Sequence, residues 1–193
     1  MNTIYILLTR SGTLLSNLVH LFTGDPFTHA SISFDPTLQP LYSSARKNGE
    51  TMFPAGPCQE SFHRGFYRKH RHIPCALYAL DVAQEQYELA IEEMERIIDH
   101  SDDYHFNILG LLLCRLNIPM RRTNKFFCSQ FVAEILLRSD SLPLPKVPSL
   151  MRPMDYTCLP GVSCLYRGTL RELVAMRSTL PESEDACIPI PIQ

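Results

Sequence analysis

The stretch Asn124-Lys-Phe-Phe-Cys128-Ser-Gln-Phe-Val-Ala-Glu-Ile-Leu-Leu137 places a cysteine where a loop turns into an apolar helix. The apolar positions behind the cysteine recur at helical spacing: Phe131, Val132, Ile135 and Leu136. This spacing predicts a helix that begins within a residue or two of Cys128. The first turn of a helix presents unpaired backbone N–H groups and the positive end of the helix dipole, and both stabilise a thiolate. The same N–H groups can hold the oxyanion of an acyl-transfer intermediate, so the stretch predicts the nucleophile of a cysteine hydrolase.

A packing role is the alternative for this thiol, because free cysteine is among the most buried residue types. Six further cysteines have no motif around them: Cys58, Cys75, Cys114, Cys158, Cys164 and Cys187. Seven is an odd number, the spacing is irregular and no C-x-x-C pair occurs, which argues against a disulfide framework and a structural zinc site. Free thiols suit the reducing cytoplasm.

The composition is that of an ordinary globular protein. A chain of 193 residues can form one domain with a sizeable core, and 45% hydrophobic with 20% charged residues is typical of that class. The net charge of -2 and the short basic runs 68–71 and 121–122 give no electrostatic case for nucleic acid. Residues 1–10 are apolar for only five positions without a basic region before them, so a strand is expected there and not a signal peptide. The prediction is a single domain over 1–180 with a flexible tail over 181–193, located in the cytoplasm and of open oligomeric state.

Periodicity and turn residues predict strands and helices in a mixed order. The expected strands are residues 3–8, 27–34, 41–45, 75–82 and 163–166. The expected helices are residues 11–22, 84–98, 106–116, 127–137 and 169–176. Two stretches rich in Gly, Pro or charge, 46–72 and 142–160, are expected to be loops. The predicted fold class is α+β.

The segment Phe27-Thr28-His29-Ala30-Ser31-Ile32-Ser33-Phe34 carries a candidate general base. Alternation along a strand puts its apolar residues on one face and His29 with the two serines on the other. A pKa near ~6.5 lets an imidazole take a thiol proton and return it to a leaving group. The other six histidines lack this setting, and a structural histidine is the alternative interpretation.

A catalytic imidazole usually needs a third group that fixes its tautomer and orientation. The neighbouring strand offers Ser43, which a short turn would bring near His29, and we take Ser43 as the predicted third residue. Ser44 and Tyr42 stay open because the register can slip by one. Glu60, in the expected long loop, is the one nearby acid that stays a candidate.

Together these residues resemble the circularly permuted branch of the NlpC/P60 cysteine hydrolase superfamily, most closely the bacterial YiiX/YebB-like proteins. In that group a histidine on an early strand precedes the cysteine on a later helix. Thr28-His29-Ala30-Ser31-Ile32 is similar to the histidine strand, and Phe127-Cys128-Ser129-Gln130-Phe131-Val132 to the cysteine helix. The likeness also takes in Tyr42-Ser-Ser-Ala-Arg-Lys47 and Arg152-Pro-Met-Asp155, so it spans roughly residues 3 to 168. The chain departs at Ser43, where relatives often carry an acidic or amide residue.

The resemblance implies a papain-like core, in which a small antiparallel sheet packs against the Cys128 helix. It implies acyl transfer: His29 deprotonates Cys128, the thiolate attacks an amide or ester carbonyl, and water hydrolyses the thioacyl-enzyme. The N–H of Cys128 would supply part of the oxyanion hole, and no metal or organic cofactor is required. Relatives act on peptidoglycan stem peptides, lipid amides or esters, and isopeptide bonds. The expected partner is therefore a small-molecule, peptide or lipid-like acyl substrate, with no nucleic acid and no transmembrane segment.

Two other functions fit the same residues. One is a non-catalytic binding module that keeps the hydrolase fold. The other is a redox-sensing thiol, because a cysteine of low pKa is also oxidisable. In that case Cys114 or Cys158 would have to approach Cys128 in the fold and act as the resolving thiol.

Overall fold

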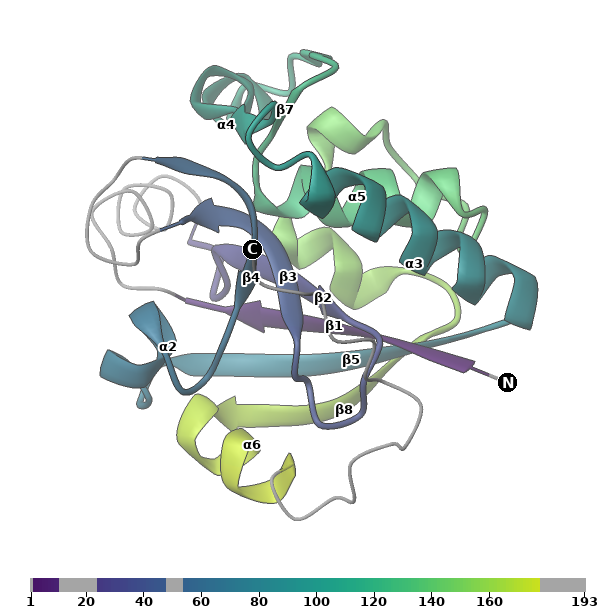
Figure 1. Ribbon diagram of the computed structural model, residues 1–193. Helices are drawn as coiled ribbons and strands as arrows, with labels where there is room; N and C mark the ends of the chain where they lie inside the picture. Colours follow the sequence, from purple (N-terminus) through teal and green to yellow (C-terminus); the bar gives the residue numbers. More distant parts are fainter. Residues whose placement is uncertain (1, 11–23, 48–53, 178–193) are drawn as a thin grey trace.

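Six antiparallel strands form one sheet in the order β4-β3-β2-β1-β5-β8, and β6 and β7 form a separate parallel pair (Figure 1). The structure is a computed structural model that describes residues 2–10, 24–47 and 54–177. The strands are β1 (Asn2–Thr9), β2 (His29–Ser33), β3 (Leu41–Arg46), β4 (Ala55–Glu60), β5 (Pro74–Val82), β6 (His105–Phe106), β7 (Lys125–Phe126) and β8 (Val162–Thr169). The helices are α2 (Gly65–Lys69), α3 (Gln84–Asp99), α4 (Ile108–Arg115), α5 (Cys128–Arg138) and α6 (Leu170–Arg177), with 3₁₀ turns η1 (Pro148–Leu150) and η2 (Pro153–Cys158).

Helices cover both faces of the sheet. One face packs against α3 and α5 and forms the first core, whose large members include Ile4, Ile6, Leu8, Ile32, Met94, Phe126 and Phe131. The other face packs against α2 and α6 and forms the second core: Leu7, Leu38, Leu41, Phe62, Tyr67, Cys75, Leu77, Leu170, Leu173 and Val174. Figure 1 shows α3 and α5 on one side of the strands and α6 on the other. The α+β class, with a small antiparallel sheet packed against helices, is confirmed.

The central strand β1 fixes the position of the predicted histidine. Its side chains alternate between the two cores. A shift of the strand register by one residue would therefore turn each side chain of β1 toward the wrong core. In the resulting register, Thr9 stands opposite His29 and Leu7 stands opposite Ser31. His29 and Ser31 therefore share the face of the second core, while Ile32 points into the first.

Pairing between β2 and β3 is much sparser than elsewhere in the sheet. Among the described residues, their register is limited to Ile32 opposite Tyr42. On the far side of this seam, β3 and β4 pair along their whole length, from Leu41 opposite Glu60 to Arg46 opposite Ala55. The sheet thus consists of a ribbon β2-β1-β5-β8 and a ribbon β3-β4, joined at the seam.

The helix that begins at Cys128 is the most deeply buried helix of the described chain. Nine consecutive residues of α5, from Cys128 to Leu136, are buried. Polar anchors hold its first turn: the Ser129 hydroxyl donates to Met151 O at 2.8 Å, and the Tyr156 hydroxyl donates to Ser129 O at 2.6 Å. A helix that is buried all round and tied at its beginning cannot rotate freely, which fixes the direction of its first side chains.

Two stretches expected to be loops contain regular structure. Residues 46–72 include β4 and α2, although 48–53 lie outside the described residues. The sequence of β4, Ala-Gly-Pro-Cys-Gln-Glu, lacks apolar alternation, and the strand exists because it pairs with β3 at the sheet edge, where proline is tolerated. The stretch 142–160 contains η1 and η2.

The expected helix 106–116 begins later than predicted. The side chain of Asn107 accepts a hydrogen bond from the Gly110 N–H at 2.9 Å and caps α4, so the helix starts at Ile108. The remaining expected strands and helices within the described ranges are present with shifts of up to three residues at their ends, the largest at the end of β8. The predicted helix 11–22 and the predicted tail 181–193 lie outside the described residues.

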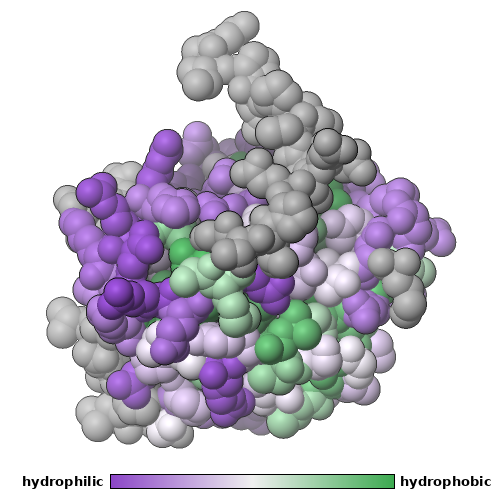
Figure 2. Space-filling view, turned by 90° about the horizontal axis from the view of Figure 1, so that it is seen from below, coloured by the Kyte–Doolittle hydropathy of each residue, from purple (hydrophilic) through white to green (hydrophobic). Residues whose placement is uncertain are grey.

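Polar and apolar side chains alternate in small groups on the face shown in Figure 2. Within the described ranges, no helix has the length and apolar character needed to cross a membrane.

Candidate functional site

The Cys128 thiol lies at an N-terminus that no side chain caps. The N-cap residue of α5 is Phe127, whose carbonyl accepts the first helical bond, from the Phe131 N–H at 2.9 Å. The N–H groups of the preceding helical residues are thus free of helical partners. The Sγ atom lies 3.9 Å from Thr28 O, and the backbone N–H groups of Ala30 and Ser129 contribute to lowering the pKa of the thiol. The thiol is therefore surrounded by backbone dipoles at the positive end of the helix.

His29 faces a buried carboxylate. Its Nε2 lies 3.1 Å from Glu60 Oε2, and only 13% and 14% of the two side chains are exposed. The Ser31 hydroxyl donates to the same carboxylate oxygen at 2.7 Å and lies 3.3 Å from His29 Nε2. Because Glu60 and Ser31 occupy Nε2, Nδ1 is the ring nitrogen left to face Cys128.

Opposite pKa shifts accompany this geometry. Burial alone would lower the pKa of His29, but the negative charges of Glu60 and Cys128 outweigh it and raise the value from 6.5 to about 10. Burial alone would raise the pKa of Cys128, but the positive charge of His29 and the surrounding hydrogen bonds lower it. The lowered thiol pKa and the raised imidazole pKa both favour transfer of the proton from Cys128 to His29, which gives a thiolate–imidazolium pair.

The acid in contact with His29 comes from the edge strand. Glu60 is the last residue of β4 and stands opposite Leu41. Burial would raise the pKa of Glu60, but the charge of His29 and the hydrogen bonds from His29 and Ser31 lower it. The carboxylate therefore remains ionised and can fix the ring orientation of His29.

The predicted third residue, Ser43, does not contact the imidazole. Its Oγ is buried without a hydrogen-bond partner, although it is close enough to Glu60 to contribute to the lowered pKa of that carboxylate. Ser44 faces the opposite side, where its hydroxyl donates to Phe126 O at 2.7 Å, and Tyr42 packs against the first core. Of the four candidates, the structure brings Glu60 to His29.

Three polar residues of the site were not proposed as catalytic from the sequence. Ser31 carries a weak signal, since it lies two positions after His29 on the same strand and so shares its face. Tyr67 of α2 and Thr9 of β1 carry none. The Tyr67 hydroxyl lies 3.4 Å from Thr9 Oγ1, and burial and the charge of Glu60 raise its pKa well above 10.0. Tyr67 thus closes the buried side of the network as a neutral phenol.

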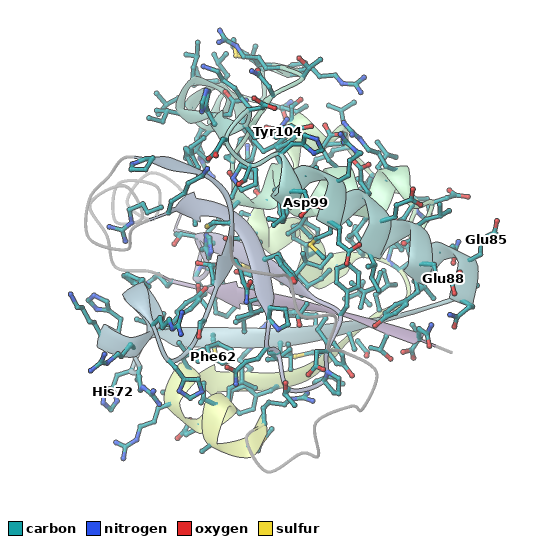
Figure 3. The ribbon with its side chains drawn as sticks, in the orientation of Figure 1. Phe62, His72, Glu85, Glu88, Asp99 and Tyr104 are labelled. Atoms are coloured by element: carbon teal, nitrogen blue, oxygen red, sulfur yellow. The ribbon has the colours of Figure 1, made fainter. Side chains whose placement is uncertain are left out.

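No other described histidine or cysteine offers a comparable pair. The remaining described histidines are exposed, and His72 points away from the body of the molecule in Figure 3. Burial raises the pKa of Cys114 and raises that of Cys58 and Cys75 to about 12, so these thiols are protonated. The described residues contain no group of three or more His, Cys, Asp or Glu side chains able to hold a metal ion.

The sequence matches no protein-family model and no curated protein.

Cys128 lies in a small surface depression. The depression encloses about 10 Å³, enough for about one water molecule, and its described wall includes Thr28, Cys114, Arg115 and Arg152. A larger cavity of about 530 Å³ lies between β6, α4 and Lys47, but no pair of nucleophile and base lines it. We therefore place the candidate site at the smaller depression, which is lined by Cys128 and the start of α5.

Proposed function

We propose that the protein is a cysteine hydrolase that cleaves amide or ester bonds through a thioacyl-enzyme on Cys128. One observation carries the proposal: the thiol at the start of α5 faces an imidazole whose second nitrogen lies 3.1 Å from a buried carboxylate. Nucleophile, base and orienting acid thus occur together with pKa shifts of the required sign. The proposal agrees with the resemblance to the papain-like NlpC/P60 enzymes.

The geometry supports a two-step reaction. The Cys128 thiolate attacks the substrate carbonyl, and the oxyanion receives hydrogen bonds from the N–H groups at the start of α5. The His29 imidazolium donates its proton to the leaving amine or alcohol, and the thioacyl-enzyme remains. The neutral imidazole then takes a proton from water, the resulting hydroxide attacks the thioester, and the acid product leaves with the thiolate restored.

Glu60 has a positioning role in this scheme. It holds the ring of His29 with Nδ1 toward the thiol and stabilises the imidazolium that forms in each step. The mechanism uses the side chains of Cys128, His29 and Glu60, the backbone N–H groups at the start of α5, and water. The proposed location is the reducing cytoplasm, because the six described cysteines are unpaired and the nucleophile must stay reduced.

The first test is the pH dependence of Cys128 alkylation by iodoacetamide, followed by mass spectrometry of the peptide that contains it. The wild type should titrate well below the value of ~8.5 for a free thiol, and His29→Ala should lose that shift. An unshifted or inert thiol in the wild type would favour the non-catalytic binding module.

The second test seeks the acyl intermediate itself. A nitrophenyl ester should give a burst of nitrophenolate and a single acyl adduct on Cys128. Replacing the exposed Cys164 by alanine is the matched control, because it removes an accessible thiol outside the site and should leave the burst unchanged. A burst that survives Cys128→Ala would contradict the proposed nucleophile.

A further inference from the structure

Two arginine side chains form part of the wall beside the thiol. The depression that contains Cys128 is also lined by Arg115, the last residue of α4, and by Arg152, which precedes η2. Arg152 is held in place by the end of α4: its Nη2 donates to Cys114 O at 3.1 Å and lies 3.5 Å from Arg115 O. Carbonyl groups at a helix C-terminus carry partial negative charge and favour a cation, so these contacts hold the guanidinium beside the site. We call Arg115 and Arg152 the arginine wall.

The protein compensates these two charges incompletely. Arg115 Nη1 lies 3.5 Å from Asp25 Oδ2, which is longer than an ordinary N–H···O hydrogen bond. Asp155 accepts from the backbone N–H of Arg152 at 2.8 Å and from Lys146 Nζ at 2.7 Å. The Nε atoms of both arginines are buried without a hydrogen-bond partner. Within the described residues, the two guanidinium groups therefore lack a full set of hydrogen-bond acceptors.

The described lining of the depression also carries a net positive charge. Its described lining contains two guanidinium groups and one carboxylate, that of Asp25. The Cys128–His29 pair adds no net charge, and Glu60 lies on the far nitrogen of the imidazole. A substrate that reaches the thiol therefore passes a wall with an excess of positive charge.

We infer that the arginine wall binds an anionic group, a carboxylate or a phosphate, which the substrate carries close to its scissile carbonyl. Planar guanidinium groups suit both anions, since they present paired N–H donors to two oxygens at once. The inference rests on the proposed function, because it assigns the wall to the substrate of Cys128. It narrows the acyl substrates to those with an acidic group next to the bond that is cleaved.

The test compares two alkylating agents of almost equal size. Iodoacetate carries a carboxylate and iodoacetamide does not, and each is followed at the Cys128 peptide by mass spectrometry. The ratio of the two rate constants should fall about threefold to tenfold in Arg115→Gln, as expected when one unit charge is removed from partly solvated surroundings near the reacting carbon. Arg152→Lys should lower the ratio less, because it keeps the charge and loses the planar fork. Added salt should reduce the ratio in the wild type.

Arg96→Gln is the matched control, since it removes the same charge on α3, where Arg96 pairs with Glu93. Its ratio should equal that of the wild type. An equal ratio in Arg115→Gln overturns the inference while iodoacetamide reactivity still supports the hydrolase. A wild-type Cys128 that is inert to both reagents overturns the hydrolase and the inference together.

Protection experiments then identify the anion. Inorganic phosphate or acetate is added during alkylation by iodoacetamide, and the slowing of the reaction at Cys128 is measured. Protection by phosphate that disappears in Arg115→Gln assigns a phosphate, and protection by acetate with the same dependence assigns a carboxylate. Absence of protection by both anions overturns the inference, because the wall would then act on approaching reagents without binding them.

Discussion

Replacing Glu60 by glutamine should weaken the thiolate without changing the shape of the site. The amide keeps the size of the side chain but removes the charge that lies 3.1 Å from His29 Nε2. A hydrogen bond to a charged group contributes about 1.5–3 kcal/mol, which corresponds to about one to two pKa units. Glu60 is the strongest positive contributor to the rise in the His29 pKa from 6.5 to about 10, so its loss removes part of that rise. The ratio of the thiolate–imidazolium pair to the neutral thiol–imidazole pair should fall about 10-fold to 100-fold.

The assay is the rate of Cys128 alkylation by iodoacetamide between pH 5 and 10. The rate of Glu60→Gln at pH 6.5 should fall by about 10-fold to 100-fold, and its profile should shift to higher pH. At the alkaline end the two proteins should converge, because both thiols are then ionised. Thermal unfolding of the variant shows whether the fold persists.

Two further variants separate this effect from its alternatives. Glu85→Gln removes a carboxylate at the start of α3, where the side chain projects away from the sheet (Figure 3), and should leave the profile unchanged. Ser43→Ala tests the third residue predicted from the sequence and should shift the profile less than Glu60→Gln. A larger shift in Ser43→Ala, or an unchanged profile in Glu60→Gln, would refute the role given to Glu60.

Three other results are expected. Cys128→Ala should abolish acyl-enzyme formation while changing the free energy of unfolding by no more than about 2 kcal/mol, as measured by urea denaturation; a collapse of stability would instead indicate a packing role for the thiol. Ser44→Ala should lower the free energy of unfolding by about 1 kcal/mol, because it removes a buried hydrogen bond. Ser43→Ala should lower it less, because the Ser43 hydroxyl has no hydrogen-bond partner. Calorimetry of the two variants measures the order, and the reverse order would contradict this expectation. The stability advantage of the wild type over Glu60→Gln should be largest between pH 4.5 and 6.5: it declines in acid as the lowered pKa of Glu60 is crossed, and in alkali as His29 loses its proton near pH 10. An advantage that does not change with pH would show that the ionised pair does not cause it.

Local patterns predict the parts of this fold that bury apolar side chains periodically. The alternation around Ile32 and the helical spacing behind Cys128 both specify which face is buried, and that is enough to place the histidine strand and the cysteine helix. The edge strand that carries Glu60 has no such pattern, because only one of its neighbours is a strand and a proline interrupts it. Its existence depends on pairing with β3, a long-range contact.

The same limit explains the choice of Ser43 as the third residue. Closeness to His29 along the predicted hairpin favours it, but the sparse pairing of β2 with β3 leaves its hydroxyl without contact to the imidazole. The acid that contacts His29 is instead Glu60 of β4, the strand beyond β3. The sequence did not predict the position of Tyr67 either. Its hydroxyl lies near Thr9, and it belongs to the short helix α2 within a stretch that was expected to be a loop.

The seam between β2 and β3 has a mechanical consequence. His29 and Ser31 belong to one ribbon and Glu60 to the other, so the contacts of the carboxylate cross a seam with a single residue pair in register. A twist of β3-β4 against the rest of the sheet would lengthen these contacts. The pKa of His29 would then change with the twist of the sheet. Titration of His29 with and without a molecule bound along β3-β4 would measure this change. A ligand that binds along β3-β4 and displaces Glu60 is therefore expected to change the reactivity of Cys128.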